Sequence, residues 1–476
     1  MPPVAEQEET TEPDPPRAGR DLTVGSIPRH VVAFAAPMVA GNALQTAYGL
    51  VNGFWVGQRL GPHALAAVTV SQPVIFVTIS AAAGLTLATN ILIAQYYGAR
   101  NWERIKGVVQ TSAVLIMGIS AMLVGVGLTL APHLLRAVDT PPDIFPAALS
   151  YLRIMFWTLP LTFAVFLIGS MLRGIGDSKT PVYFQAVSVG VNAVLDPLLM
   201  FGYLGLPKLG LNGTAWATIV AQTAAVVALL IFVPGHRPLV MPDWRRPRMH
   251  LGTVRTLVVV GIPSMVQQSS VSFSMIFIVK FVSQFGSNVD AAFGAGLRLD
   301  GVAFLPALTI GMAISTIAGQ NIGAGRLDRV REAFRWGVVL SGGVSLAIML
   351  AVLCFPRLLL HAFLPSREVA VVTIGVGYLR VVAFTYVVYA VMFVSNGIIN
   401  GAGHTTSTMV ITMATLLGLR VPLAAHLPHV THSPTGIWYA MLASVTCGML
   451  MSLAYYFSGR WRIPVVRARA AVTEPE

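Results

Sequence analysis

The sequence predicts an all-α integral membrane protein with twelve transmembrane helices, arranged as two six-helix repeats of the same orientation. Of the 476 residues, 55% are hydrophobic and 11% are charged, and the mean hydropathy is +0.72. That little charge cannot cover a water-facing surface. In addition, segments of the first half return about 226 residues later in the second half. These pairs are Tyr151–Arg153 with Tyr378–Arg380, Gln95 with Gln320, Gly98–Ala99 with Gly323–Ala324, Pro37 with Pro263, Pro197 with Pro422, and Arg173–Asp177 with Asn400–His404.

Uncharged runs of bilayer-spanning length follow one another along the chain. They cover residues 31–58, 107–135, 154–172, 256–279, 301–325 and 336–356. Longer apolar runs over 60–99, 381–419 and 421–459 are expected to break at Gly, Pro and His clusters. Only helices and closed barrels satisfy every backbone group in lipid, and alternating strand patterns are absent from the sequence. The spans are therefore predicted to be helices, six in each half.

The distribution of basic residues predicts the orientation of these helices. Arginine and lysine concentrate on one side of a twelve-helix map, whereas the other side holds only Arg59, Arg136, Lys208, Arg357 and Arg367. This asymmetry places both termini in the cytoplasm, and the net charge of +12 is then an orientation signal rather than a sign of nucleic-acid binding. Six helices per half give the two repeats the same orientation. The expected divisions are a cytoplasmic tail (1–27), a first lobe (28–233), a cytoplasmic linker (234–255), a second lobe (256–459) and a tail (460–476).

Short motifs in a fixed order carry a resemblance to a known family. They are Pro37, Leu60-Gly61 through Ala67, Leu172–Asp177, Asn192–Pro197, Gly213 through Thr218, Gly319–Gly325 and Gly436–Trp438. The pattern resembles the multidrug and toxic compound extrusion family over nearly all of residues 28–458. The resemblance implies a two-lobed antiporter in the cytoplasmic membrane, which exports small amphipathic compounds against an inward flow of protons or sodium. Internal repeats around a central site are typical of such transporters.

Asp196 is the expected coupling residue. A carboxylate inside a membrane helix costs roughly 2.5 to 3.5 kcal/mol on insertion scales, so it usually has a functional reason. Asn192 lies four positions earlier on the same helix face and can hydrogen-bond either protonation state; by resemblance, Thr218 completes the group. The structural alternative is that Asp196 caps the helix beside Pro197 in headgroup water. Many relatives carry an aspartate at the position of Asn52, and its loss here favours a proton over sodium, which prefers several oxygen ligands.

The first span carries a thin polar stripe. Met38, Asn42, Gln45, Gly49 and Asn52 recur at spacings of three and four. Such a stripe faces a partner helix or a cavity rather than lipid. Pro37 provides a place to bend, and by resemblance this hinge takes part in switching between cation-bound and substrate-bound states. Ordinary packing through Gly41 and Gly49 explains the stripe equally well.

A central cavity is expected to bind the exported compounds. The predicted lining is apolar and aromatic, which suits varied amphipathic molecules, although membrane helices also pack with such residues. The predicted residues are Gln45, Tyr48, Gln72, Phe76, Met155, Trp157, Gln267, Phe273, Tyr386, Tyr389, Met392 and Asn396. Besides small organic substrates, we expect contact with membrane lipids, no nucleic acid, no cofactor other than the coupling ion, and a monomer.

Other polar clusters are interpreted as structural. His426, His429 and His432 recur every three residues, but Pro428 and the expected loop favour a solvated turn over a metal site. Lys280, Arg298 and Asp300 are expected to form an ion pair or gate near the outer face.

Two other function classes require residues that this sequence does not place at mid-membrane. A lipid-linked oligosaccharide flippase of related architecture would need several basic residues at mid-membrane, and an intramembrane enzyme would need paired acids, a Ser/His couple or metal ligands. Few positive charges here fall at mid-helix, and no such catalytic group is evident.

Overall fold

The computed structural model describes residues 19–243, 249–363 and 369–463. Within these ranges the elements are helices, and no strand occurs. The first half contains α1 (Ile27–Trp55), the π-helical turn η1 (Val56–Leu60), α2 (Pro62–Gly98), α3 (Trp102–Ala137), α4 (Phe145–Gly174), α5 (Lys179–Phe201), the short 3-10 helix η2 (Tyr203–Gly205) and α6 (Leu211–His236). The short helix η3 (Pro238–Val240) follows.

The second half repeats this order. It contains α7 (Leu251–Ser283), α8 (Ser287–Gly323), α9 (Leu327–Cys354), the short α10 (Pro356–His361), α11 (Val369–Val382), α12 (Phe384–Gly401), α13 (Thr405–Met413), the π-helical η4 (Ala414–Arg420), α14 (Val421–Thr431), α15 (Thr435–Phe457) and η5 (Arg460–Arg462). Eleven stretches of helix are long and apolar enough to cross a membrane, with Val369–Gly401 and Thr405–Thr431 each counted as one span. The polar stripe lowers the hydropathy of α1, which at 29 residues is long enough to be the twelfth.

The structure differs from the predicted spans in two details. The run 60–99 does not break, because α2 continues as one 37-residue helix through Pro73. Neighbouring helices supply the packing that tolerates proline inside a membrane helix. The histidines at 426 and 429 do not lie in a solvated turn but in α14, and His432 ends that helix with φ 48°. The described residues contain no group of three or more His, Cys, Asp or Glu placed to hold a metal ion.

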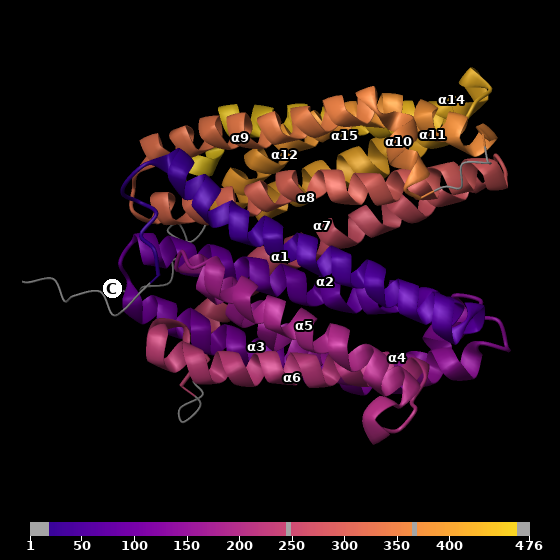
Figure 1. Ribbon diagram of the computed structural model, residues 1–476. Coiled ribbons are helices and arrows are strands. Elements are labelled where there is room, and N and C mark those ends of the chain that lie inside the picture. Colours follow the sequence, from indigo (N-terminus) through magenta and orange to yellow (C-terminus); the bar gives the residue numbers. More distant parts are fainter. Residues whose placement is uncertain (1–18, 244–248, 364–368, 464–476) are drawn as a thin grey trace, which may run out of the picture.

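The two halves pack as separate bundles joined through a few helices. In the first half α4 packs against α2, α3 and α6, and in the second half α12 packs against α8, α9 and α15. Between the halves, α1 contacts α8 and α9, while α2 contacts α7 and α8. Figure 1 shows the indigo and magenta half beside the orange and yellow half, with α1 and α2 running between them.

Equivalent residues of the two repeats form reciprocal bonds at one end of the molecule. The side-chain amide of Gln95 on α2 donates to the carbonyl oxygen of Gly401 at 2.7 Å. In the opposite direction, Gln320 on α8 donates to the carbonyl oxygen of Gly174 at 2.9 Å. Each donor and each acceptor therefore has its repeat counterpart in the other bond, as expected for parallel repeats related by an axis along the membrane normal. The last turns of α2 and α8, which carry these glutamines, thus join the halves.

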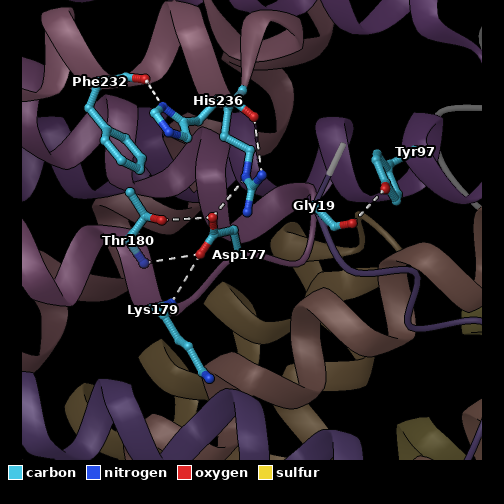
Figure 2. A network of polar contacts seen from close by, with 8 residues as sticks. Gly19, Tyr97, Asp177, Lys179, Thr180, Phe232 and His236 are labelled. Carbon is cyan, nitrogen blue, oxygen red and sulfur yellow. Dashed lines mark hydrogen bonds and ion pairs between the residues drawn. The ribbon is translucent and has the colours of Figure 1, made fainter. Parts of the chain in front are cut away.

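The same end also anchors the segment that leaves the first half. Asp177, before α5, accepts hydrogen bonds from the backbone and hydroxyl of Thr180 at 3.0 and 2.8 Å. Its carboxylate also pairs with Arg237 Nε at 2.9 Å, directly after α6 (Figure 2). One buried carboxylate therefore holds the start of α5 and the residue that follows α6. This structural role explains why Asp177 belongs to the motif 172–177.

Candidate functional site

The candidate site lies where α1 meets α5. Asp196 of α5 is 1% exposed. Its Oδ2 atom accepts two hydrogen bonds from α1, one from the Asn52 amide at 2.6 Å and one from the Tyr48 hydroxyl at 2.8 Å. Tyr48 and Asn52 are four residues apart, so one face of α1 presents both donors to the carboxylate. Asp196 therefore faces a partner helix and not headgroup water.

Two neighbouring residues extend this polar cluster. Asn192, one turn before Asp196, donates its amide to the Thr218 hydroxyl on α6 at 3.4 Å. Its amide oxygen and Asp196 Oδ1 are both sealed from solvent and receive no hydrogen bond from the described residues. The expected grouping of Asn52, Asn192, Asp196 and Thr218 is thus found on three adjoining helices, with two acceptor oxygens lacking donors.

The sequence predicts that Tyr48 lines the substrate cavity. In the structure its hydroxyl group donates a hydrogen bond to the Asp196 carboxylate. The signal that points to this role is its spacing of four from Asn52 within the polar stripe. Elsewhere on the stripe, Asn42 donates to Thr309 of α8 at 3.0 Å, which links α1 to the second half. Gln45 accepts from Gln185 of α5 at 3.5 Å. Pro37 lies inside α1, which continues on both sides of it.

The predicted cavity residues differ in how accessible they are. Gln45, Gln72, Phe76, Trp157 and Phe273 are exposed, whereas Tyr48, Met155, Gln267, Tyr389 and Met392 are half-buried.

Two of the predicted cavity residues are enclosed within the second half. Tyr386 is 0% exposed and Asn396 is 6% exposed. The amide oxygen of Asn396 accepts from Ser452 of α15 at 2.8 Å. Neither side chain therefore lines an open surface in this conformation, because each is packed among helices of its own bundle.

A second buried carboxylate lies in the other half. Asp300 of α8 is 2% exposed and accepts hydrogen bonds from the hydroxyls of Tyr378 and Tyr386, the latter at 2.7 Å. The predicted ion pair with Lys280 or Arg298 is absent from the described residues, since both basic side chains are exposed and neither pairs with Asp300. The three residues have similar predicted depths along their spans, but α8 turns Asp300 inward and leaves Arg298 exposed.

Comparison with known proteins agrees with the repeated, two-lobed architecture. The MatE family model matches the chain twice, over residues 37–198 and 263–425. Two relatives come from Bacillus subtilis (strain 168). The probable multidrug resistance protein YpnP is 32% identical over 443 residues, with 93% of this chain and 97% of the relative covered. The probable multidrug resistance protein YoeA is 31% identical over 436 residues, with 90% and 94% covered.

Solved structures share the fold. A multidrug resistance MATE family transporter of the MOP superfamily, in an outward-facing conformation, superposes with a TM-score of 0.85 at 24% identity, covering 94% of this chain and 99% of that one. A MATE structure in a bent conformation gives a TM-score of 0.84 at 24% identity, with 94% and 98% covered. With the family model matched in both halves, the chain belongs to the multidrug and toxic compound extrusion family of multidrug efflux transporters, which are secondary transporters of the cell membrane rather than enzymes.

Proposed function

We propose that this protein is a proton-coupled antiporter that exports small amphipathic organic compounds by alternating access, with both termini in the cytoplasm. The observation that carries the coupling proposal is the pair of oxygens without donors, Asp196 Oδ1 and Asn192 Oδ1. The two residues lie one helical turn apart on α5, both acceptors lack a donor, and an unsatisfied buried polar atom costs about 1–3 kcal/mol. A proton on Asp196 Oδ1 turns that atom into a donor for Asn192 and leaves Oδ2 to accept from α1.

The composition of the site favours a proton over a sodium ion. Hard cations bind several oxygens and usually a net negative site. Here the position on α1 closest to the carboxylate is Asn52, whose amide nitrogen points at Asp196 and repels a cation. Only one carboxylate belongs to the described cluster, so a single proton is enough to neutralise it.

Coupling to transport follows from the position of the carboxylate between helices. Asp196 is bonded to α1, and α1 also contacts α8 and α9 of the other half. Protonation weakens the two hydrogen bonds that Asp196 Oδ2 accepts, because a neutral acid is a poorer acceptor than a carboxylate. The proton thereby changes how α1 is held, and Pro37 gives α1 a place to bend.

Alternating access is supported by the reciprocal bonds at one end. The bonds made by Gln95 and Gln320 hold the halves together there. The segments 100–106 and 326–335, which directly follow α2 and α8, are rich in basic residues, so the positive-inside rule assigns this end to the cytoplasm. The chain shares its fold with a transporter solved in an outward-facing conformation, and an outward-facing state is one closed on the cytoplasmic side.

We assign the exposed and half-buried residues of the predicted lining to the cargo path. They are Gln45, Gln72, Phe76, Met155, Trp157, Gln267, Phe273, Tyr389 and Met392.

The experiment is transport in sealed inverted vesicles with a proton gradient or a sodium gradient imposed separately. Ethidium and naphthaleneacetate serve as probes, and the variants are Asp196→Asn and Asp143→Asn. Asp143 is an exposed carboxylate in a surface ion pair, so its variant controls for loss of charge alone. We expect proton-driven accumulation in the wild type and in Asp143→Asn but not in Asp196→Asn. Accumulation driven by sodium alone, or undiminished proton-driven accumulation in Asp196→Asn, contradicts the proposal.

A further inference from the structure

A buried arginine in the second half has no part in the coupling site. Arg420 lies where η4 meets α14, inside the span Thr405–Thr431, and is 7% exposed. An arginine at this depth costs roughly 2.5–3.5 kcal/mol on insertion scales and usually marks a functional position. The two longest apolar runs of the second half end on either side of it, and no other arginine or lysine occurs between residues 381 and 459 of the sequence.

The charge of Arg420 is not neutralised by the protein. Its Nε donates to the Ser444 hydroxyl on α15 at 2.8 Å, and one terminal nitrogen donates to the Tyr389 hydroxyl on α12 at 3.3 Å. Both partners are uncharged. In the part of the chain that the structure describes, no carboxylate pairs with this guanidinium. A guanidinium has five N–H donors, so most of its donors remain available to a ligand.

The repeat places this arginine beside the counterpart of the coupling carboxylate. With Pro197 paired to Pro422, Arg420 corresponds to Leu195 and Asp196 to Val421. The span that contains Arg420 is the counterpart of α5, and α15, which carries Ser444, is the counterpart of α6. In the first half Asn192 donates to Thr218 beside an acid; in the second half Arg420 donates to Ser444. Corresponding regions of the two halves, one residue apart in register, therefore carry side chains of opposite charge. Arg420 is the last residue of the π-helical η4, and π-helical turns occur frequently at functional sites.

Through Tyr389, the arginine adjoins a group of aromatic side chains. The ring of Tyr389 stacks on Phe393, with ring centres 5.3 Å apart and planes at 19°. Phe304 of α8 also meets Tyr389 edge-on, with ring centres 4.7 Å apart. All three rings are half-buried. A basic group beside an aromatic surface fits a molecule that carries an anionic group on an apolar or aromatic body.

We propose that Arg420, together with Tyr389, binds the carboxylate or sulfonate group of an exported amphipathic compound, so that the cargo of this transporter includes organic anions. The proposal rests on the export function proposed above and specifies its cargo class. A bidentate guanidinium contact orients a planar carboxylate, and the aromatic rings receive the apolar body. A bound anion also neutralises the buried charge of Arg420, which is otherwise uncompensated.

The test is binding to the purified full chain in neutral detergent without any gradient. Tritiated naphthaleneacetate and naphthaleneacetamide have similar shape and differ in charge. We expect the wild type to bind the acetate roughly tenfold to a hundredfold more tightly, as charge-assisted hydrogen bonds do. In Arg420→Gln this preference is lost because acetate affinity falls to that of the amide. The control Arg298→Gln removes an exposed arginine and keeps the wild-type preference. Equal binding of the two probes by the wild type, or a preference that survives in Arg420→Gln, overturns the proposal.

If Arg420→Gln does not fold, a second variant tests whether Arg420 binds the anionic group. Arg420→Lys keeps the charge but loses the fork of donors, so acetate affinity is expected to fall several-fold while amide affinity is unchanged. Unchanged acetate affinity in this variant contradicts the proposal. Chloride and dioctanoyl-phosphatidylglycerol are tested as competitors. Arg420-dependent binding of either, without a preference for acetate over amide, identifies an inorganic-ion or lipid site and overturns the assignment to cargo. Because no gradient is used, failure of proton coupling in the vesicle assay leaves this result unaffected.

Discussion

Gly98 of α2 lies directly against the backbone of Gln320 on α8. A Cβ atom added to Gly98 would come within 1.8 Å of the Gln320 carbonyl oxygen. The relation is repeated with the halves exchanged, because a Cβ on Gly323 would come within 1.9 Å of the Gln95 carbonyl oxygen. Both glycines are therefore required by a close approach of two helices, and both lie next to the glutamines that join the halves.

Replacing Gly98 by alanine should open this end of the molecule. Alanine favours a helix over glycine by roughly 0.8–1.0 kcal/mol, so any loss of order must come from the closer contact between α2 and α8. Overpacking of this kind costs about 1–3 kcal/mol. We expect faster hydrogen–deuterium exchange in residues 93–99 and 318–324 of Gly98→Ala, and the same result for Gly323→Ala.

Gly118→Ala is the matched control for this substitution. Gly118 lies within α3, and nothing lies within 4 Å of the position of its added Cβ. Its exchange at the 93–99 and 318–324 segments should equal that of the wild type. Exchange in Gly98→Ala that also equals the wild type would show that the close approach does not hold the halves together.

Replacing Asn52 by aspartate should add a response to sodium. The amide of Asn52 donates to Asp196 at 2.6 Å, so Asn52→Asp places two carboxylates together. A pair of acids attracts a cation or shares a proton, because both cannot stay charged at that distance. We expect sodium-gradient-driven accumulation of ethidium in Asn52→Asp vesicles. Asn52→Leu, which removes the donor without adding charge, should show none, and sodium stimulation of both variants would rule out this explanation.

Replacing Arg237 by alanine should destabilise the protein, because it removes the ion pair that joins the end of α6 to Asp177. The Asp177 side chain is 7% exposed and its Arg237 partner 29%, so the substitution leaves a buried carboxylate without its cation. Arg237→Ala is expected to lower stability by roughly 1–3 kcal/mol, measured as a fall in thermal unfolding temperature in detergent. His63→Ala breaks a surface pair whose side chains are 77% and 59% exposed and should leave that temperature unchanged. Equal effects of the two variants would contradict the assigned difference in burial.

The Asp300 cluster should behave as a unit in stability measurements. Asp300→Ala leaves the hydroxyls of Tyr378 and Tyr386 buried without their acceptor, which is expected to cost roughly 2–5 kcal/mol. Adding Tyr378→Phe and Tyr386→Phe removes the stranded donors, so the triple variant should unfold at a higher temperature than Asp300→Ala. Additive losses across the three substitutions would show that the groups do not act together.

The helices and the repeat could be predicted from the sequence because lipid imposes simple conditions. A span needs a minimum length and must satisfy its own backbone, and both conditions are visible in the apolar runs. The continuity of α2 through Pro73 was not predictable in this way, because it depends on packing against helices of both halves.

The polar sites were predictable only where partners lie on one helix. The spacing of Asn192 and Asp196 pointed to a common face, and the structure places both in one cluster. Contacts between distant helices were not available from spacing, so Tyr48 was assigned to cargo and Asp300 to an ion pair. Arg420 was visible as a single charge between two apolar runs, but its partners on α12 and α15 lie 31 and 24 residues away along the chain.

The acceptors in the reciprocal bonds at Gln95 and Gln320 are backbone carbonyls, which no point substitution deletes. Each half therefore offers the other an acceptor that persists whatever its own side chains are, and a donor that a single substitution removes. Loss of either glutamine leaves a carbonyl of the opposite half without its side-chain donor, so a change in one bundle is felt first in the other.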